Sequence, residues 1–381
     1  MHFANQQQPP VLRCQACDAQ HAIDAPIWAC PCGGLLDVEM PPVFPVDRLA
    51  ARPASLWRYR EALPLRPDTQ PVSLGESMTP LLPVTAGGRE VFLKVDYLLP
   101  TGSFKDRGAA ILLTKMRELG VTSAVEDSSG NAGAAIAAYA AAAGVPVSIY
   151  IPASAPPAKA SQIRLFGGRL VPVAGSREDT TSAALAEARQ SYYASHVWNP
   201  YFLEGTKTAA FEIWEQLGHR VPDWVITPVG NGTMVLGLYN GFRHLQAAGV
   251  TARLPRIIGV QTANCAPLAA AWNSDPRALP EVTCKSTLAD GIAIARPLRW
   301  RQILAAVRET DGQIVQVDDE AIWRAFTGWA RRGIAVEPTA ASALACLDQW
   351  AASSGPQANE TVVAMLTGSA LKTSAQILNQ T

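Results

Sequence analysis

The sequence lacks an excess of charge of either sign. Its 381 residues carry 32 basic and 32 acidic side chains, so the formal net charge is +0, and the pI is near 7.0. A balanced chain offers no long-range attraction to nucleic acid or to an anionic membrane surface. We therefore expect neither as a partner, and a small charged ligand would have to be held by local groups.

Long apolar runs are also scarce. Residues 132–151 contain no charge, but they are mostly alanine and are interrupted at Gly144 and Pro146. This pattern indicates a buried helix followed by a buried strand rather than a membrane span. The first ten residues lack a basic region followed by an apolar run, so we expect no secretory signal and a cytoplasmic protein.

Cysteines are few and unevenly placed. Four of the seven lie near the N-terminus, at Cys14, Cys17, Cys30 and Cys32, and the others are scattered, at Cys265, Cys284 and Cys346. An odd count without a secretory signal predicts reduced thiols. Cys14-x-x-Cys17 has the spacing of half a tetrahedral zinc site, although Cys30-x-Cys32 is one residue shorter than the common second half. The interpretations are a structural zinc site, which we favour, or four buried thiols without metal. A nucleic-acid-binding knuckle is disfavoured because Arg13 is the only arginine or lysine before Arg48.

Apolar strand-like runs alternate with alanine-rich helical segments from about Val91 onward. Strands are expected at 91–95, 123–126, 147–151, 170–173, 224–229, 257–261, 314–317 and 362–366, and helices at 132–143, 204–217 and 319–331. This order predicts an α/β protein with mostly parallel sheets and helices on both faces. A proline-rich connector, 41–83, separates this region from the cysteine-bearing arm.

Four loops at expected strand-to-helix junctions carry chemically useful residues. Thr101-Gly102-Ser103-Phe104-Lys105-Asp106 places Lys105 at the start of a helix, where Ser103 is a candidate cap. A lysine attacks a carbonyl only when its amine is neutral, and desolvation or a Schiff base achieves this. Taken alone, an exposed lysine in the first helical turn is the simpler interpretation.

The second loop, Ser128-Ser129-Gly130-Asn131-Ala132-Gly133, precedes the polyalanine helix. Its small residues allow close approach of a ligand, and the helix N-terminus suits a carboxylate. A capped helix with a tight turn explains the same residues equally well.

The third loop is Gly230-Asn231-Gly232-Thr233-Met234. Successive backbone N–H groups in such a turn can hold a phosphate. The loop matches a dinucleotide fingerprint only in part, since position 235 is Val, and the chain contains no ATP-type Gly-x-x-x-x-Gly-Lys-Ser/Thr motif. A small phosphorylated cofactor therefore fits better than NAD.

The fourth loop is 366–372, after the last expected strand. Thr367 offers a neutral hydroxyl that does not force a pyridine nitrogen to be protonated. Ser369-x-x-Lys372 matches the nucleophile motif of penicillin-interacting serine enzymes, but the accompanying Lys-Thr-Gly is missing. We regard the four-residue match as accidental.

Together these motifs resemble the fold-type II pyridoxal-phosphate enzymes, the tryptophan-synthase-β type, and most of all the threonine synthase family. The resemblance runs from about Gly75 to Lys372 and includes 100–108, 128–133, 230–233, 289–294, 337–341 and 366–368. Cys14-x-x-Cys17 with 32–36 also resembles the N-terminal segment of many members. The implied architecture is an α/β fold of two lobes with mostly parallel sheets flanked by helices. We expect a cysteine-rich arm at 1–40, a large cofactor-binding domain of 41–107 and 204–381, and a small domain of 108–203.

The resemblance implies a role for each candidate residue. Lys105 would hold pyridoxal 5'-phosphate as a Schiff base and then move substrate protons, while Thr367 would face the pyridine nitrogen. Asn131 would bind the phenolic oxygen of the cofactor, and residues 230–234 its phosphate. Thr101, Ser129 and Asn131 would hold the carboxylate of a small amino-acid substrate. The implied reaction converts O-phospho-L-homoserine and water to L-threonine and phosphate, in a homodimer.

Two positions depart from the family pattern. A serine shortly before Asn199-Pro200 and an arginine two residues after the proline help the family to bind the substrate's phosphate, whereas this chain has Val197 and Phe202. Losing a hydroxyl and a guanidinium weakens recognition of a second phosphate. A β-eliminating serine or threonine dehydratase, or a β-replacement synthase, is therefore the alternative function.

Overall fold

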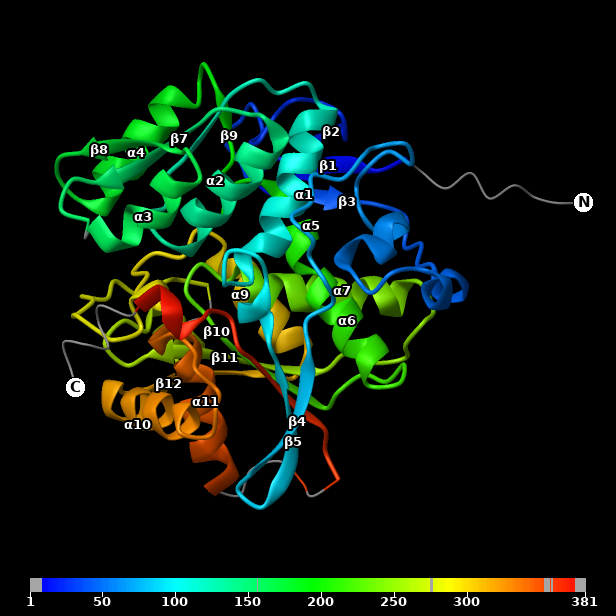
Figure 1. Ribbon diagram of the computed structural model, residues 1–381, viewed down its shortest axis with the longest axis vertical. Helices are drawn as coiled ribbons and strands as arrows, with labels where there is room; N and C mark the ends of the chain where they lie inside the picture. Colours follow the sequence, from blue (N-terminus) through cyan, green and yellow to red (C-terminus); the bar gives the residue numbers. More distant parts are fainter. Residues whose placement is uncertain (1–8, 156, 275–276, 353–356, 358, 374–381) are drawn as a thin grey trace, which may run out of the picture. The chain divides into compact units, whose positions relative to one another are not determined.

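The chain folds into two compact units, and most of the helices and strands are labelled in Figure 1. The computed structural model describes residues 9–155, 157–274, 277–352, 357 and 359–373. The first unit consists of residues 1–74, 107–205 and 247–250, and the second of 75–106, 206–246 and 251–381. In the part of the chain that is described, no helix is both long and apolar enough to cross a bilayer.

The first unit contains two sheets. A three-stranded antiparallel sheet has the order β2-β1-β3, and a four-stranded parallel sheet has the order β8-β7-β6-β9. The strands are β1 (Val11–Cys14), β2 (Gln20–Ala22), β3 (Leu36–Glu39), β6 (Ala124–Glu126), β7 (Val147–Pro152), β8 (Arg169–Val173) and β9 (Tyr192–Tyr193). The helices are η1 (Val46–Ala51), η2 (Leu56–Ala62), α1 (Lys105–Glu118), α2 (Asn131–Ala143), α3 (Pro157–Leu165), α4 (Arg177–Glu187) and α5 (Pro200–Thr206).

Helices cover both faces of the four-stranded sheet. Successive side chains of a strand point to opposite faces. In β7, Ile149 and Ile151 pack into a cluster with residues of α1 and α2, whereas Tyr150 packs with Ala184 of α4. The continuous burial of this strand therefore reflects a parallel sheet covered on both sides.

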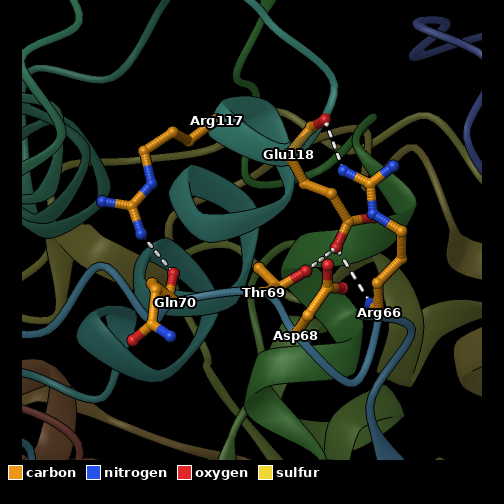
Figure 2. Close-up of a pocket in the computed structure, with 6 residues that line it drawn as sticks. All are labelled: Arg66, Asp68, Thr69, Gln70, Arg117 and Glu118. Carbon is orange, nitrogen blue, oxygen red and sulfur yellow. Dashed lines mark hydrogen bonds and ion pairs between the residues drawn. The ribbon is translucent and has the colours of Figure 1, made fainter.

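A buried carboxylate joins the proline-rich connector to the end of α1 (Figure 2). The Glu118 side chain is only 1% exposed, and its carboxylate accepts hydrogen bonds from Thr69 Oγ1 and, at 2.9 Å, from the Arg66 N–H. Val72 donates its N–H to Thr114 Oγ1 at 2.9 Å. Residues 41–74 thus belong to the first unit, whereas the sequence-based division placed them with the large domain.

The second unit is built on a six-stranded sheet of order β12-β11-β10-β13-β5-β4, in which only β4 is antiparallel to its neighbour. The strands are β4 (Leu81–Ala86), β5 (Arg89–Lys94), β10 (Trp224–Pro228), β11 (Arg256–Thr262), β12 (Gln313–Val317) and β13 (Val362–Met365). The helices are η3 (Asp96–Leu98), α6 (Thr208–Gln216), α7 (Thr233–Ala247), α8 (Pro267–Trp272), η4 (Asp290–Ile292), α9 (Trp300–Glu309), α10 (Asp319–Ala330), α11 (Pro338–Ala352) and η5 (Ala370–Thr373).

Both faces of this sheet are buried as well. In β10, Ile226 joins the core formed with α10 and α11, while the alternate residue Val225 is equally buried. All eight expected strands are present, but the helix expected over 204–217 is divided at Lys207 into α5 and α6. The expectation of reduced thiols is wrong for Cys265 and Cys284, which form a disulfide, whereas Cys346 is a free, buried thiol.

Candidate active site

Lys105 is the first residue of α1 and belongs to the second unit, whereas the helix from Arg107 onward belongs to the first. The Lys105 amine meets the start of α7 in the second unit. Lys105 Nζ donates a hydrogen bond to Thr233 Oγ1 at 3.1 Å, and it lies 4.5 Å from the centroid of the Phe104 ring. The preceding turn needs Gly102, whose φ of 81° is in the left-handed region. The expectation that Ser103 caps α1 is wrong, because its buried Oγ has no hydrogen-bond partner among the described residues.

The glycine loop before α7 packs so closely on its neighbours that Gly230 and Gly232 have no space for side chains. A Cβ at Gly232, where φ is 78°, would lie 2.2 Å from Ile303 Cδ1. A Cβ at Gly230 would lie 3.0 Å from the Cα of Ile292. Thr233 then begins a helix of 15 residues, whose first N–H groups have no partner within the helix. The loop thus combines a close-packed turn with a helix N-terminus that suits a phosphate.

Thr367 lies beside the Lys105 turn, just beyond β13. Its carbonyl accepts a hydrogen bond from the Phe104 N–H at 2.9 Å. Its Oγ1 atom is buried and has no hydrogen-bond partner among the described residues. A buried hydroxyl of this kind is costly unless a ligand satisfies it. The second unit therefore brings together Lys105, the 230–234 loop and Thr367.

Thr101 belongs to the same region, but its polar groups are already used. Its N–H and Oγ1 donate to the two carboxylate oxygens of Asp106, at 2.7 and 2.6 Å. Burial raises the pKa of Asp106 to about 7, although the two donors of Thr101 and the charge of Lys372 oppose this rise. Direct binding of a substrate carboxylate by the Thr101 hydroxyl stays a prediction and would require a rearrangement.

Ser129 lies on the loop between β6 and α2, and Asn131 is the first residue of α2; both belong to the first unit. The loop is tight: a Cβ at Gly133 would lie 1.9 Å from the Ser128 carbonyl oxygen, and Gly130 donates its N–H to Ser128 Oγ at 3.3 Å. Both candidate residues are partly exposed, so they are open to a ligand. Their roles in binding cofactor and substrate stay predictions.

The two departures from the family pattern lie in the core of the first unit. Phe202 is fully buried, and its ring packs so closely on Gly108 that a Cβ there would lie 2.4 Å away. Val197 is also buried. Next to it, His196 Nδ1 lies 2.9 Å from Glu126 Oε1. Glu126 is the last residue of β6, and His196 follows β9 by three residues. The sequence analysis missed this pair, although a glutamate ending an apolar strand was a usable signal.

The four N-terminal cysteines form a cluster in the first unit. Cys14 Sγ lies 3.5 Å from Cys32 Sγ, and Cys17 Sγ lies 3.8 Å from Cys30 Sγ. All four sulfur atoms are within 4.8 Å of one another. Gly34 is required beside them, because a Cβ there would lie 2.5 Å from Cys14 Sγ.

These features would suit a phosphorylated aldehyde on a lysine, and comparison with known proteins identifies the family of the chain. Residues 72–368 match the family described as pyridoxal-phosphate dependent enzyme. The chain belongs to this family.

The relatives found by sequence point further, to one activity. Threonine synthase of Methanosarcina acetivorans is 35% identical over 373 residues, which cover 95% of this chain and 92% of that protein. Threonine synthase of Synechocystis sp. is 38% identical over 338 residues, covering 84% of each chain. Maize serine racemase matches the fold with a TM-score of 0.68 at 24% identity, over 80% of this chain and 92% of that structure. The expected fold-type II architecture, the pyridoxal phosphate cofactor and the class of lyase similar to threonine synthase are confirmed at the level of the family.

Proposed function

We propose that this chain converts O-phospho-L-homoserine and water to L-threonine and phosphate. The observation that carries the proposal is the similarity to threonine synthases along nearly the whole chain, combined with the meeting of Lys105 and the glycine loop at Thr233. Pyridoxal phosphate, when bound, delocalises the charge that develops at the substrate α-carbon. The protein has to position the substrate and move its protons.

The residues present suit that cofactor. The orphaned Thr367 hydroxyl offers a neutral partner for a ring nitrogen, and the 230–234 loop offers backbone donors for a phosphate. Lys105 would hold the aldehyde and afterwards act as the base and acid for substrate protons. We propose that Asn131 binds the phenolic oxygen, and that Ser129, Asn131 and Thr101 bind the substrate carboxylate.

A second candidate function is supported by the environment of Phe202. Its ring is fully buried against Gly108 and lies edge-on to His196 at 6.0 Å between centroids. This position therefore supplies no guanidinium for a substrate phosphate. The second candidate is a dehydratase of serine or threonine, or a β-replacement synthase, since neither needs a distal phosphate.

A comparison of substrates tests the proposal. The cofactor-loaded chain is incubated separately with O-phosphohomoserine, O-phosphoserine, threonine and serine, and phosphate, threonine and keto acid are assayed. We expect threonine and phosphate in equal amounts from O-phosphohomoserine, and neither product from Lys105→Ala. Keto acid from threonine or serine alone would establish the second candidate instead.

We propose in addition that the four N-terminal cysteines bind one structural zinc ion. A tetrahedral site with zinc–sulfur distances of about 2.3 Å requires sulfur–sulfur distances of about 3.8 Å. The distances of 3.5 and 3.8 Å in the cluster are close to this value.

We also propose a cytoplasmic homodimer, as the family resemblance implies. Sedimentation should then give twice the chain mass of 40.6 kDa. A mass equal to one chain would contradict the dimer and leave the activity to be tested separately.

A further inference from the structure

The turn that carries Lys105 is held by the segment that follows the last strand. Ser369 donates its N–H to the Gly102 carbonyl at 3.0 Å, and Ser103 forms an isolated β-bridge with Gly368. With the bond from the Phe104 N–H to the Thr367 carbonyl, these contacts fasten two segments more than 260 residues apart in sequence. All of them lie within the second unit.

Lys372 adds a charged contact to this junction. Its Nζ atom donates a hydrogen bond of 2.6 Å to the carbonyl oxygen of Thr101. Its aliphatic chain covers the turn at Gly102, where a Cβ would lie 3.4 Å from Lys372 Cδ. Lys372 therefore does not act as the partner of Ser369 that a Ser-x-x-Lys nucleophile motif would require; Ser369 Oγ instead accepts the Leu371 N–H at 3.3 Å.

The charges around Lys372 favour this arrangement. The carboxylates of Glu337 and Asp106 both attract its ammonium and oppose the lowering of the Lys372 pKa that burial causes. Asp106 also binds the N–H and Oγ1 of Thr101. Thr101 is thus held on its carbonyl side by Lys372 and on its amide side by Asp106, only four residues before Lys105.

We propose that Lys372 is a positioning residue that fixes the turn of residues 101–104 and so sets where the Lys105 amine meets Thr233. The proposal rests on the proposed function of Lys105 as the cofactor lysine. A glycine-containing turn has many accessible conformations, and a hydrogen bond from a charged donor is stronger than one between neutral groups. Losing it should loosen the turn without unfolding the sheet, because β13 and β5 are paired independently.

Amide hydrogen exchange of the full-length chain tests the proposal, with and without cofactor. The variants are Lys372→Met, which removes the charged donor, Lys372→Gln, which keeps a neutral donor, and Lys372→Arg, which keeps the charge. Lys285→Met is the matched control, because Lys285 is an exposed lysine of the same unit.

We expect Lys372→Met to speed exchange about tenfold in residues 100–106, with β10 unchanged, and to speed cofactor release by a similar factor. With Lys372→Arg, both rates should return most of the way to those of the unaltered chain. Lys285→Met should behave as the unaltered chain. Faster exchange throughout the second unit would show a merely structural role and overturn the proposal. Unchanged exchange in 100–106, or no recovery with Lys372→Arg, would also overturn it.

If Lys372→Met does not fold, Lys372→Gln serves for the same measurement. If neither folds, the residue is structural and the proposal fails. The exchange of the cofactor-free chain reports on Lys372 even when Lys105 is not the cofactor lysine. Failure of borohydride to fix cofactor on Lys105 of the unaltered chain is therefore a separate result, which contradicts the proposed function.

Discussion

Lys105 Nζ and Thr233 Oγ1 lie 3.1 Å apart, which joins the first residue of α1 to the first residue of α7. The two residues are 128 positions apart in sequence. The contact places an amine at the N-terminus of a 15-residue helix, where the helix dipole favours an anion. A phosphorylated aldehyde matches both groups, since its aldehyde reacts with the amine and its phosphate suits the helix.

Replacing Thr233 should weaken cofactor binding in a graded way. Thr233→Val keeps the shape but removes the hydroxyl, and we expect cofactor to be bound about tenfold more weakly because a hydrogen bond to a charged group is lost. Thr233→Ser keeps the hydroxyl and should remain within about threefold of the unaltered chain. Equilibrium titration of the visible absorption band measures both, and equal affinities for the two variants would contradict the role of the hydroxyl.

Asp106 should make stability depend on pH. Burial raises its pKa from the ordinary value of 3.8 to about 7 in the folded chain, so between these values the folded state binds more protons than the unfolded state. The free energy of unfolding should therefore fall as pH rises from about 4 to 7, by at most about 4 kcal/mol. Above pH 7 the contribution of Asp106 should no longer change with pH.

Asp106→Asn cannot titrate, so the difference in unfolding free energy between it and the unaltered chain should change over the same pH range. Urea unfolding at pH 4, 5.5, 7 and 8.5 measures this difference. A constant difference across the series would show that the Asp106 pKa is not raised.

Gly108→Ala should destabilise the first unit. Alanine is the better helix former by about 1 kcal/mol, but the Cβ would lie 2.4 Å from the buried Phe202 ring, and overpacking of a core costs about 1–3 kcal/mol. We expect a net loss of up to about 2 kcal/mol in denaturant unfolding, near the upper end of this range because a buried ring has little space into which it can shift.

Gly328→Ala is the matched control. Gly328 also lies within a helix, but a Cβ there meets nothing within 4 Å, so the change should stabilise by about 0.5–1 kcal/mol. The double variant Gly108→Ala with Phe202→Leu should recover part of the loss. Equal stabilities for Gly108→Ala and Gly328→Ala would contradict the packing of Phe202.

The sequence predicts the sheets well where burial on both faces gives continuous apolar runs. The strand at Trp224–Pro228 is such a run, and every one of its residues is buried. The antiparallel edge strand β4 was not predicted, because Pro83 within Leu81–Ala86 gives that segment the character of the proline-rich connector. The division of one expected helix at Lys207 was missed because apolar residues such as Leu203 and Phe211 continue a helical pattern on both sides of it.

The candidate site was predictable to the extent that its loops follow strands of one sheet. Parallel strands end at the same edge, so the loops after β10 and β13 meet there. The contact of Lys372 with Thr101 joins residues 271 positions apart, and no local pattern encodes such a pairing. The same reason explains why the Cys265–Cys284 disulfide and the attachment of residues 66–72 to α1 were not foreseen.

Removing zinc should loosen the N-terminal sheet while leaving the second unit intact. Cys17→Ser removes one of four ligands, and we expect zinc content to fall well below one ion per chain and local stability of β1–β3 to fall by a few kcal/mol. This is less than the ~10–16 kcal/mol that zinc supplies to isolated fingers, because Tyr201 also anchors this region through a 2.6 Å hydrogen bond to the Ile23 carbonyl. Metal analysis and amide hydrogen exchange measure the two effects, and Ala16→Ser, at the adjacent exposed position, should change neither. The cluster would consist of four free thiols if the unaltered chain, purified in the presence of zinc, held no metal. The same would follow if Cys17→Ser had the metal content and exchange rates of Ala16→Ser.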